Sequence, residues 1–179
     1  MVRERIDPGA RPAALVIVSD THVPARARDL PEPLWSALAS ADVVIHAGDW
    51  VDAALLDRFE ALPARLVGVW GNNDGAPLRA RLPEVARVQL AGVRIDVVHE
   101  TGPAAGRERR MEARHPDADV LVFGHSHIPW DTVSPRGLRL LNPGSPTDRR
   151  RQPAGTFLRA LVDERGLRDV ELVALPPRS

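Results

Sequence analysis

Short runs of apolar, often β-branched residues recur along the chain, and each one ends abruptly in a polar cluster. In the first half, runs at 15–18, 43–45 and 65–70 alternate with segments at 33–40 and 52–62 that have the pattern of amphipathic helices. Continuous apolar runs are typical of strands buried on both faces. Strands and helices that alternate in this way predict a parallel sheet with right-handed crossovers.

The second half is richer in predicted strands. Runs at 86–90 and 93–98 flank Ala91-Gly92, which is a hairpin signal. A helix is expected at 103–115, and further strands are expected at 120–123, 131–133, 138–141, 156–162 and 169–173. The first 13 residues contain two prolines and predict a loose lead-in. No linker or repeat divides the chain, so we expect one α/β domain over residues 1–179 with its core at about 14–175.

The amino-acid composition excludes several kinds of chemistry. The 179 residues include no cysteine, lysine or tyrosine, which excludes thiolate metal sites, cysteine nucleophiles and catalytic lysines. The 24 basic and 24 acidic residues balance, so neither a stable nucleic-acid partner nor a membrane partner is expected. No apolar run approaches 18 residues and no signal-peptide pattern is present, so a cytoplasmic location is expected.

The polar clusters carry the candidate chemistry. Five of them follow apolar runs: Asp20-x-His22, Gly48-Asp49, Gly71-Asn72-Asn73-Asp74, His99, and Gly124-His125-Ser126-His127. Ligands of α/β sheets bind beyond the carboxyl ends of the strands, so these clusters are expected to converge on one rim. Carboxylate, imidazole and amide groups without thiolate are typical ligands of Mn, Fe, Zn, Co or Ni. Seven such groups suit two ions roughly 3.5–4 Å apart.

The five motifs, in this order, resemble those of the calcineurin-like metallophosphoesterases. The short chain and the Asn142-Pro143-Gly144-Ser145 segment are similar to the small YfcE-like and Vps29-like branch of that superfamily. The resemblance covers about residues 14–147. It implies a sandwich of two β-sheets with helices outside, an αββα arrangement of the metallo-dependent phosphatase type, with the site on the sandwich rim.

The resemblance also implies a ligand set. One metal would be held by Asp20, His22 and His127, the other by Asn72, His99 and His125, and Asp49 would bridge them. Of these, Asp49, Asn72 and His99 are the candidate catalytic residues. Two divalent ions are implied, with Mn²⁺ first and Fe, Ni, Co or Zn as alternatives. The implied reaction is hydrolysis of a phosphoester by a hydroxide that the binuclear centre activates.

Two positions depart from the pattern of larger family members. Asn73 stands where they have a histidine that protonates the leaving group, and an amide cannot act as a general acid. Protonation must then come from elsewhere, or good leaving groups are preferred. Glu100 follows His99 where glycine is common. Its carboxylate could support a ligating imidazole, act as an acid near the substrate, or be only a solvated side chain.

Other residues are candidates for supporting roles. Asp74 is expected to orient its neighbours or cap a turn, and Asn142 belongs to a turn near the site. His46 is expected to be packed and hydrogen-bonded rather than a ligand. Trp50 and Trp130 are expected to line the cleft because they follow two of the motifs closely. The arginine run at 149–151 is interpreted first as an exposed loop and second as a contact for a phosphate.

A metal-dependent phosphodiesterase acting on a small phosphoester is the function that the sequence favours. Two alternatives remain: a Vps29-like protein-binding scaffold with a vestigial metal site, and a nuclease acting on short nucleic acid. Relatives in this branch often associate, so a homo-oligomer is a further expectation.

Overall fold

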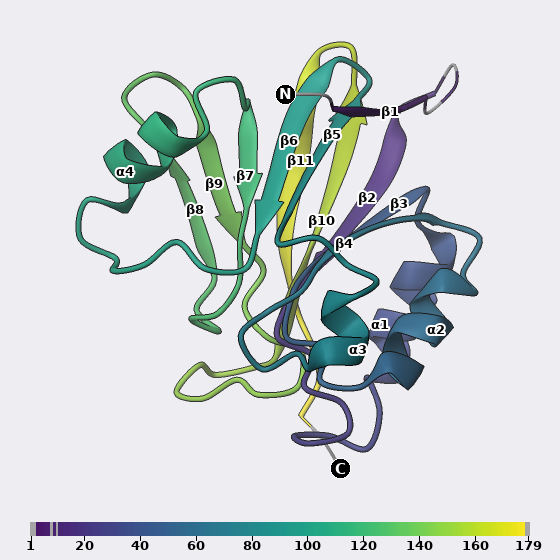
Figure 1. Cartoon of the computed structure of the whole chain (residues 1–179). Helices are drawn as coiled ribbons and strands as arrows, with labels where there is room; N and C mark the ends of the chain where they lie inside the picture. Colours follow the sequence, from purple (N-terminus) through teal and green to yellow (C-terminus); the bar gives the residue numbers. More distant parts are fainter. Residues whose placement is uncertain (1–2, 8, 10, 178–179) are drawn as a thin grey trace.

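The computed structural model describes residues 3–7, 9 and 11–177 of the chain. Two β-sheets pack face to face, and helices lie on the outer side of each (Figure 1). The five-stranded sheet has the order β11-β10-β2-β3-β4. Its strands are β2 (Ala13–Val18), β3 (Val43–Ala47), β4 (Arg65–Val69), β10 (Thr156–Asp163) and β11 (Gly166–Ala174).

The other sheet has six strands in the order β1-β5-β6-β7-β9-β8. They are β1 (Glu4–Ile6), β5 (Val85–Leu90), β6 (Val93–Val98), β7 (Val120–Val122), β8 (Trp130–Val133) and β9 (Arg139–Asn142). Helices α1 (Glu32–Ser40), α2 (Ala53–Glu60) and α3 (Ala76–Arg79) lie on the five-stranded side, and α4 (Arg107–Arg114) lies on the other (Figure 1). The αββα sandwich implied by the resemblance is therefore confirmed.

Alternating side chains of single strands enter different cores, which explains the continuous apolar runs. In β2, Leu15 and Ile17 join the core between the sheets, whereas Val16 and Val18 join the core under α1 and α2. Side chains of a strand alternate between its two faces, so both faces are covered here. On the six-stranded side, a third cluster packs Met111 of α4 over the outer face of the sheet.

Both sheets contain parallel strands whose carboxyl ends meet at one rim. Strands β2, β3 and β4 pair in parallel in one sheet, and β6, β7 and β9 pair in parallel in the other. Backbone hydrogen bonds join the loops that leave these strands, including one from the Asp20 amide to the Gly48 carbonyl at 2.9 Å. The rim is thus built jointly by the two sheets.

Two expectations about local structure were wrong, and one short helix was missed. The lead-in is not wholly loose, because β1 pairs in parallel with β5. Helix α4 begins at Arg107 rather than at Pro103, since Gly102 and Gly106 have φ angles of 73° and 68° and break the helical path. The short helix α3, with a proline in its first turn, was not predicted. No helix within the described part of the chain is long and apolar enough to cross a membrane.

Candidate metal centre

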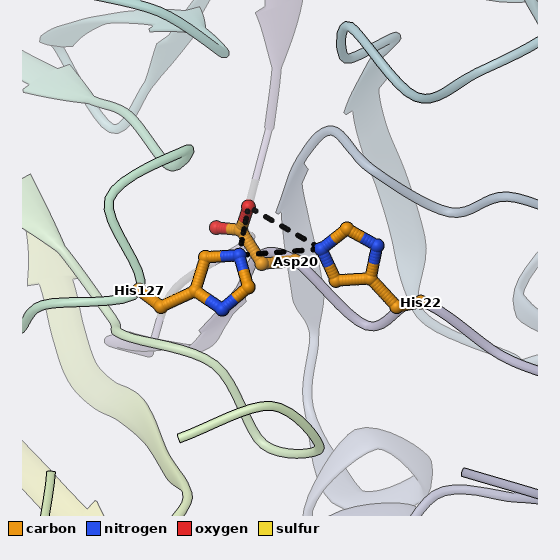
Figure 2. A group of neighbouring side chains, drawn as sticks. All are labelled: Asp20, His22 and His127. Atoms are coloured by element: carbon orange, nitrogen blue, oxygen red, sulfur yellow. Dashed lines mark hydrogen bonds and ion pairs between the residues drawn. The ribbon is translucent and has the colours of Figure 1, made fainter. Parts of the chain in front are cut away.

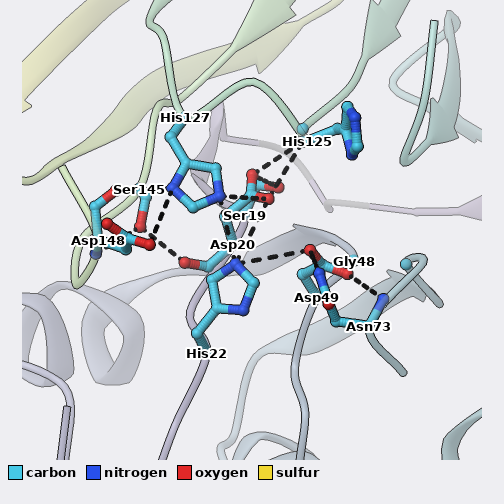
Figure 3. Close-up of polar contacts among 12 residues, drawn as sticks. Ser19, Asp20, His22, Gly48, Asp49, Asn73, His125, His127, Ser145 and Asp148 are labelled. Carbon is cyan, nitrogen blue, oxygen red and sulfur yellow. Dashed lines mark hydrogen bonds and ion pairs between the residues drawn. The ribbon is translucent and has the colours of Figure 1, made fainter. Parts of the chain in front are cut away.

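The residues predicted to meet at the rim do so. Asp20 and His22 follow β2, Asp49 follows β3, Asn72 follows β4, and His99 follows β6. His125 and His127 lie in the loop after β7, which comes from the six-stranded sheet (Figure 3). The amide of His125 donates to both carboxylate oxygens of Asp20, at 3.1 and 3.0 Å, which ties this loop to the end of β2.

The first group consists of Asp20, His22 and His127 (Figure 2). The Nε2 atoms of the two histidines are 3.3 Å apart, and Oδ1 of Asp20 lies 3.4 Å from Nε2 of His127. All three side chains are buried, with Asp20 fully so. The three donor atoms lie within 4.8 Å of one another, so this half of the site is closed to solvent.

The second group consists of Asn72, His99 and His125. Oδ1 of Asn72 lies 2.9 Å from Nε2 of His99 and 2.9 Å from Nδ1 of His125. His99 is buried, and its Nδ1 lies 2.8 Å from the Ala47 carbonyl, which fixes the ring. Asn72 and His125 are exposed, so this half of the site is the one open to solvent.

Asp49 lies between the two groups. Its Oδ2 atom is 3.5 Å from Nε2 of His22 and 3.4 Å from Nε2 of His99. A single carboxylate oxygen therefore faces both sets of donors. This is the placement that a bridging ligand needs.

Asn73 and Asp74 fix the Asp49 carboxylate and its loop. The backbone amide of Asn73 donates to Oδ1 of Asp49 at 2.9 Å, and its side-chain amide donates to Oδ2 at 2.6 Å. Asp74 is buried and accepts from the backbone amides of Asp49, Gly71 and Val51 at 3.1, 2.7 and 2.7 Å. The two residues orient Asp49 and its turn, as the sequence predicts for Asp74.

Asn142 supports the loop that carries His125 and His127. Its side-chain amide donates to the Gly124 carbonyl at 2.8 Å, and its Oδ1 accepts from the Gly144 amide at 2.8 Å. Glu100 is exposed, and its Oε1 lies 3.8 Å from Nδ1 of His125, beside the open half of the site. The Glu100 carboxylate therefore lies near a candidate ligand, and its role stays a prediction.

Several neighbours of the site were not predicted. Ser19 Oγ donates to Oδ2 of Asp20 at 2.6 Å, Ser145 Oγ donates to the Asp20 carbonyl at 2.7 Å, and Nδ1 of His127 lies 2.6 Å from the Asp148 carbonyl (Figure 3). Ser19 and Ser145 stand beside or within predicted motifs, so proximity was a usable signal for them. Nothing in the sequence pointed to the carbonyl of Asp148.

Arg150 reaches the metal-facing side of the first group. Its guanidinium Nη2 lies 3.2 Å from Nε2 of His127, although its chain segment is exposed. Of the arginine run at 149–151, this residue therefore reaches a candidate ligand, at the same ring nitrogen that faces Asp20 and His22. A guanidinium beside the donor atoms is well placed for bidentate contact with a phosphate.

Five of the seven candidate ligands have left-handed backbones. The φ angles of Asp20, His22, Asp49, His125 and His127 are 54°, 45°, 62°, 68° and 58°. Residues other than glycine adopt this region at a cost of roughly 1–3 kcal/mol each, and such residues cluster at functional sites. The turns after three strands are therefore strained in the backbone, and this strain accompanies the convergence of their side chains at the rim.

The donors influence one another's protonation. Burial raises the pKa of Asp20 to about 7. Burial opposes the charge of His99, but the Asp49 and Asp20 carboxylates outweigh it and raise the pKa of His99 to about 9. Burial likewise opposes the charge of Asp49, and its contacts with His99 and Asn73 outweigh burial and lower the Asp49 pKa. Burial lowers the pKa of His127 to about 4.

These residues fit divalent metal ions. The donors are carboxylate, imidazole and amide atoms in two groups, with separations near those expected for ligands about 2.0–2.2 Å from a shared ion. The backbone at two glycines also approaches these donors closely. A Cβ on Gly124 would lie 1.9 Å from Ser19 Oγ, and one on Gly71 would lie 2.3 Å from Asp49 Oδ1. Glycine is therefore needed at both turns for the donors to converge.

The predictions about His46 and two neighbouring tryptophans have different outcomes. His46 is fully buried, and its Nε2 lies 3.0 Å from Thr21 Oγ1, so its packed, hydrogen-bonded role is confirmed. Trp50 does not line a cleft, because it is fully buried, stacks on His46 with ring centroids 3.4 Å apart, and donates to the Val69 carbonyl. Trp130 does not line the site either, because it is half-buried against the outer core on the α4 side, with the Arg107 guanidinium 4.5 Å from its ring centroid.

Comparison with known proteins agrees with the geometry. The model of the calcineurin-like phosphoesterase superfamily domain matches residues 14–165. The chain belongs to this superfamily. A probable metallophosphoesterase of Methanocaldococcus jannaschii is 36% identical over 132 residues, which is 73% of this chain and 67% of the relative. The metal-ligand roles given above remain predictions for these residues.

Two further similarities are more distant. A phosphodiesterase of Methanocaldococcus jannaschii is 23% identical over 99 residues, which is 49% of this chain and 58% of that protein. The structure of vacuolar protein sorting 29 from Cryptosporidium parvum superposes with a TM-score of 0.76 at 21% identity, covering 93% of this chain and 99% of the other. The latter similarity concerns the fold.

Proposed function

We propose that the protein is a phosphodiesterase that uses two divalent ions, Mn²⁺ in the first instance, to hydrolyse a small phosphoester. The observation that carries this proposal is the position of Asp49. Its Oδ2 faces Nε2 of His22 at 3.5 Å and Nε2 of His99 at 3.4 Å, with one set of donors on each side. A pair of ions there would lower the pKa of a bound water and neutralise charge on phosphoryl oxygens.

The chain's own residues supply holding, orientation and charge. Asp20, His22 and His127 form the closed side of the centre, and Asn73 fixes the carboxylate of Asp49 by two hydrogen bonds. Arg150 stands beside His127 and is our candidate to hold a non-bridging phosphate oxygen. The substrate enters over the exposed pair Asn72 and His125.

No strong general acid stands at position 73. The Asn73 amide is committed to Asp49, so it cannot deliver a proton to the leaving group. We therefore expect a marked preference for leaving groups that depart as stable anions. The acidic side chain of Glu100 beside the open half also disfavours a second negative charge on the substrate, which supports diesters over monoesters. A distant relative that is named a phosphodiesterase supports the same choice.

A protein-binding scaffold is the second candidate, favoured by the similarity in fold to vacuolar protein sorting 29. A scaffold would not require seven competent donors at the rim, Asp49 among them. Nor would it require five left-handed backbones at those positions, since such strain persists where function needs it. Both observations support the enzyme.

The test is hydrolysis of bis(p-nitrophenyl) phosphate by metal-stripped protein with and without Mn²⁺. We expect turnover with Mn²⁺ and none without it. Asp49→Asn should abolish this turnover, whereas the matched variant Asp57→Asn, on the exposed face of α2, should retain it. No hydrolysis with any of Mn²⁺, Ni²⁺, Co²⁺ and Fe²⁺ would refute the proposed enzyme and favour the scaffold. Faster cleavage of an oligonucleotide than of the small diester would favour the nuclease.

A further inference from the structure

A cavity of about 380 Å³ opens beside the exposed half of the metal centre. Two of the candidate ligands, Asn72 and His99, belong to its lining. The remaining walls come from the ends of β4 and β6, the start of β5 and helix α4. Its volume lies in the range of small-molecule sites, roughly 300–1,000 Å³. A substrate whose phosphate lies at the centre can therefore place a neighbouring group in this cavity.

The inner walls are apolar and include one aromatic ring. Val85, Val98 and Met111 contribute aliphatic surface, and Trp70 contributes its indole. The indole is held in place, because the guanidinium of Arg79 lies 4.2 Å from its ring centroid and donates through Nε to the Asp74 carbonyl at 2.7 Å. Fixed aromatic and aliphatic surfaces favour flat, apolar rings.

A buried histidine gives the cavity one specific polar group. His115 lines the cavity, and its Nδ1 is 2.7 Å from the Asp96 carboxylate, which is also paired with Arg3. That contact fixes the imidazole ring. Its Nε2 makes no hydrogen bond to any residue of the described chain, and it is not sealed from solvent. The free nitrogen can therefore make a hydrogen bond to an occupant.

The charges at the mouth select against an anionic occupant. Glu84 and Glu100 lie there with Arg114, and all three side chains are exposed. Two carboxylates against one guanidinium leave the mouth slightly acidic, so a second anionic group is disfavoured. An uncharged ring with a hydrogen-bonding edge would pack on the apolar walls and make a hydrogen bond to the free imidazole nitrogen. Because it carries no negative charge, the acidic mouth would not repel it.

We infer that the cavity binds an uncharged heteroaromatic group, of the kind carried by a nucleoside, on the phosphoester whose phosphate is bound at the metal centre. The inference rests on the proposed function for the position of the phosphate. The cavity and its lining are independent of it. The inference assigns substrate selection to Trp70, Val85 and His115, none of which belongs to the candidate ligand set.

Binding can be measured without metal or turnover. Adenosine, which carries no phosphate, is titrated into metal-free ¹⁵N-labelled protein, with ribose as the control. We expect saturable amide shifts at residues 84–85 and 111–115 with adenosine in the millimolar range, and none with ribose. Shifts that are absent, or that are equal for the two compounds, would overturn the inference.

A variant that fills the cavity provides a second test of the inference. Val85→Trp places an indole at the half-buried edge of the cavity, and Val133→Trp adds the same side chain on β8 at a position that is 61% exposed. We expect Val85→Trp to abolish the adenosine shifts and to raise the KM for bis(p-nitrophenyl) phosphate about tenfold or more, the factor that loss of a buried ring implies. Val133→Trp should change neither.

The outcomes separate the two proposals. Adenosine binding without hydrolysis by any metal form would refute the proposed function and leave the cavity assignment standing. Hydrolysis with unchanged KM in a folded Val85→Trp, and no adenosine shifts in the wild type, would refute the cavity assignment alone. If Val85→Trp does not fold by circular dichroism, the comparison of adenosine with ribose on the wild type decides.

Discussion

Replacing Gly71 by alanine tests whether the close approach of the backbone to Asp49 is essential. A Cβ at this position would lie 2.3 Å from Asp49 Oδ1, 2.4 Å from the Asp49 amide nitrogen and 2.9 Å from its Cγ. The nitrogen cannot rotate away as a side chain could, because it belongs to the backbone and donates to Asp74. The turn after β3 must therefore move as a unit.

The expected loss of stability follows from this clash. Overpacking of a filled interior costs typically 1–3 kcal/mol, and we expect about 3 kcal/mol because backbone atoms are displaced. For a chain of this length, 1 kcal/mol lowers Tm by roughly 2–4 °C, so Gly71→Ala should melt about 6–12 °C below the wild type. Thermal unfolding in EDTA measures this cost without any contribution from bound metal.

Metal binding gives a second readout of the same change. Mn²⁺ should raise the Tm of the wild type, because a ligand that binds the folded state stabilises it. It should raise the Tm of Gly71→Ala much less, because Asp49 has moved. The control is Gly75→Ala, where the nearest atom to a new Cβ is Pro77 Cδ at 3.7 Å and the Tm should stay within a few degrees of the wild type. Equal Tm values and equal metal responses for Gly71→Ala and wild type would refute the reasoning.

Three further changes have definite expectations. His125→Ala should abolish Mn²⁺-dependent hydrolysis while circular dichroism shows an unchanged fold; retained activity would remove His125 from the site. Glu100→Gln should change kcat modestly, and a complete loss in the same assay would make Glu100 a direct participant. For Asp96, burial raises the carboxyl pKa, but hydrogen bonds from His115 and Arg3 outweigh it and lower the pKa. Its contribution to stability is thus present above the ordinary value of 3.8 and is lost as pH falls below it. Urea unfolding should show Asp96→Asn less stable than wild type at pH 6, with a gap that narrows toward pH 3; a constant gap would contradict the pairing.

The strand ends were predictable because two simple rules act together. Apolar runs mark strands buried on both faces, and parallel strands present their carboxyl ends at the same edge. Asp20, Asp49, Asn72 and His99 each come directly after such a run or within a few residues of it, so their meeting followed from the pattern. The paired sheets followed from the resemblance rather than from the runs themselves.

Contacts that depend on loop conformation were not predictable. Trp50 was expected at the cleft because it follows Asp49, but the left-handed backbone of Asp49 sends successive side chains in different directions and Trp50 enters the core. The Asp96–His115 pair joins β6 to the end of α4, and no local pattern links these positions. The hydrogen bonds from Asn73 to Asp49 likewise depend on how two separate turns come together.

The left-handed turns at the ligands also bear on how this chain can change over generations. A ligand such as His125, with a φ of 68° and an exposed side chain, contributes to catalysis by the proposed centre but strains the backbone that carries it. Glycine there would relieve about 1 kcal/mol or more of strain. Once selection for hydrolysis relaxes, substitutions that relieve this strain are favoured because they stabilise the folded state. Lineages that keep the sandwich for another purpose are then expected to lose His125 first, because it is the candidate ligand that is both exposed and left-handed.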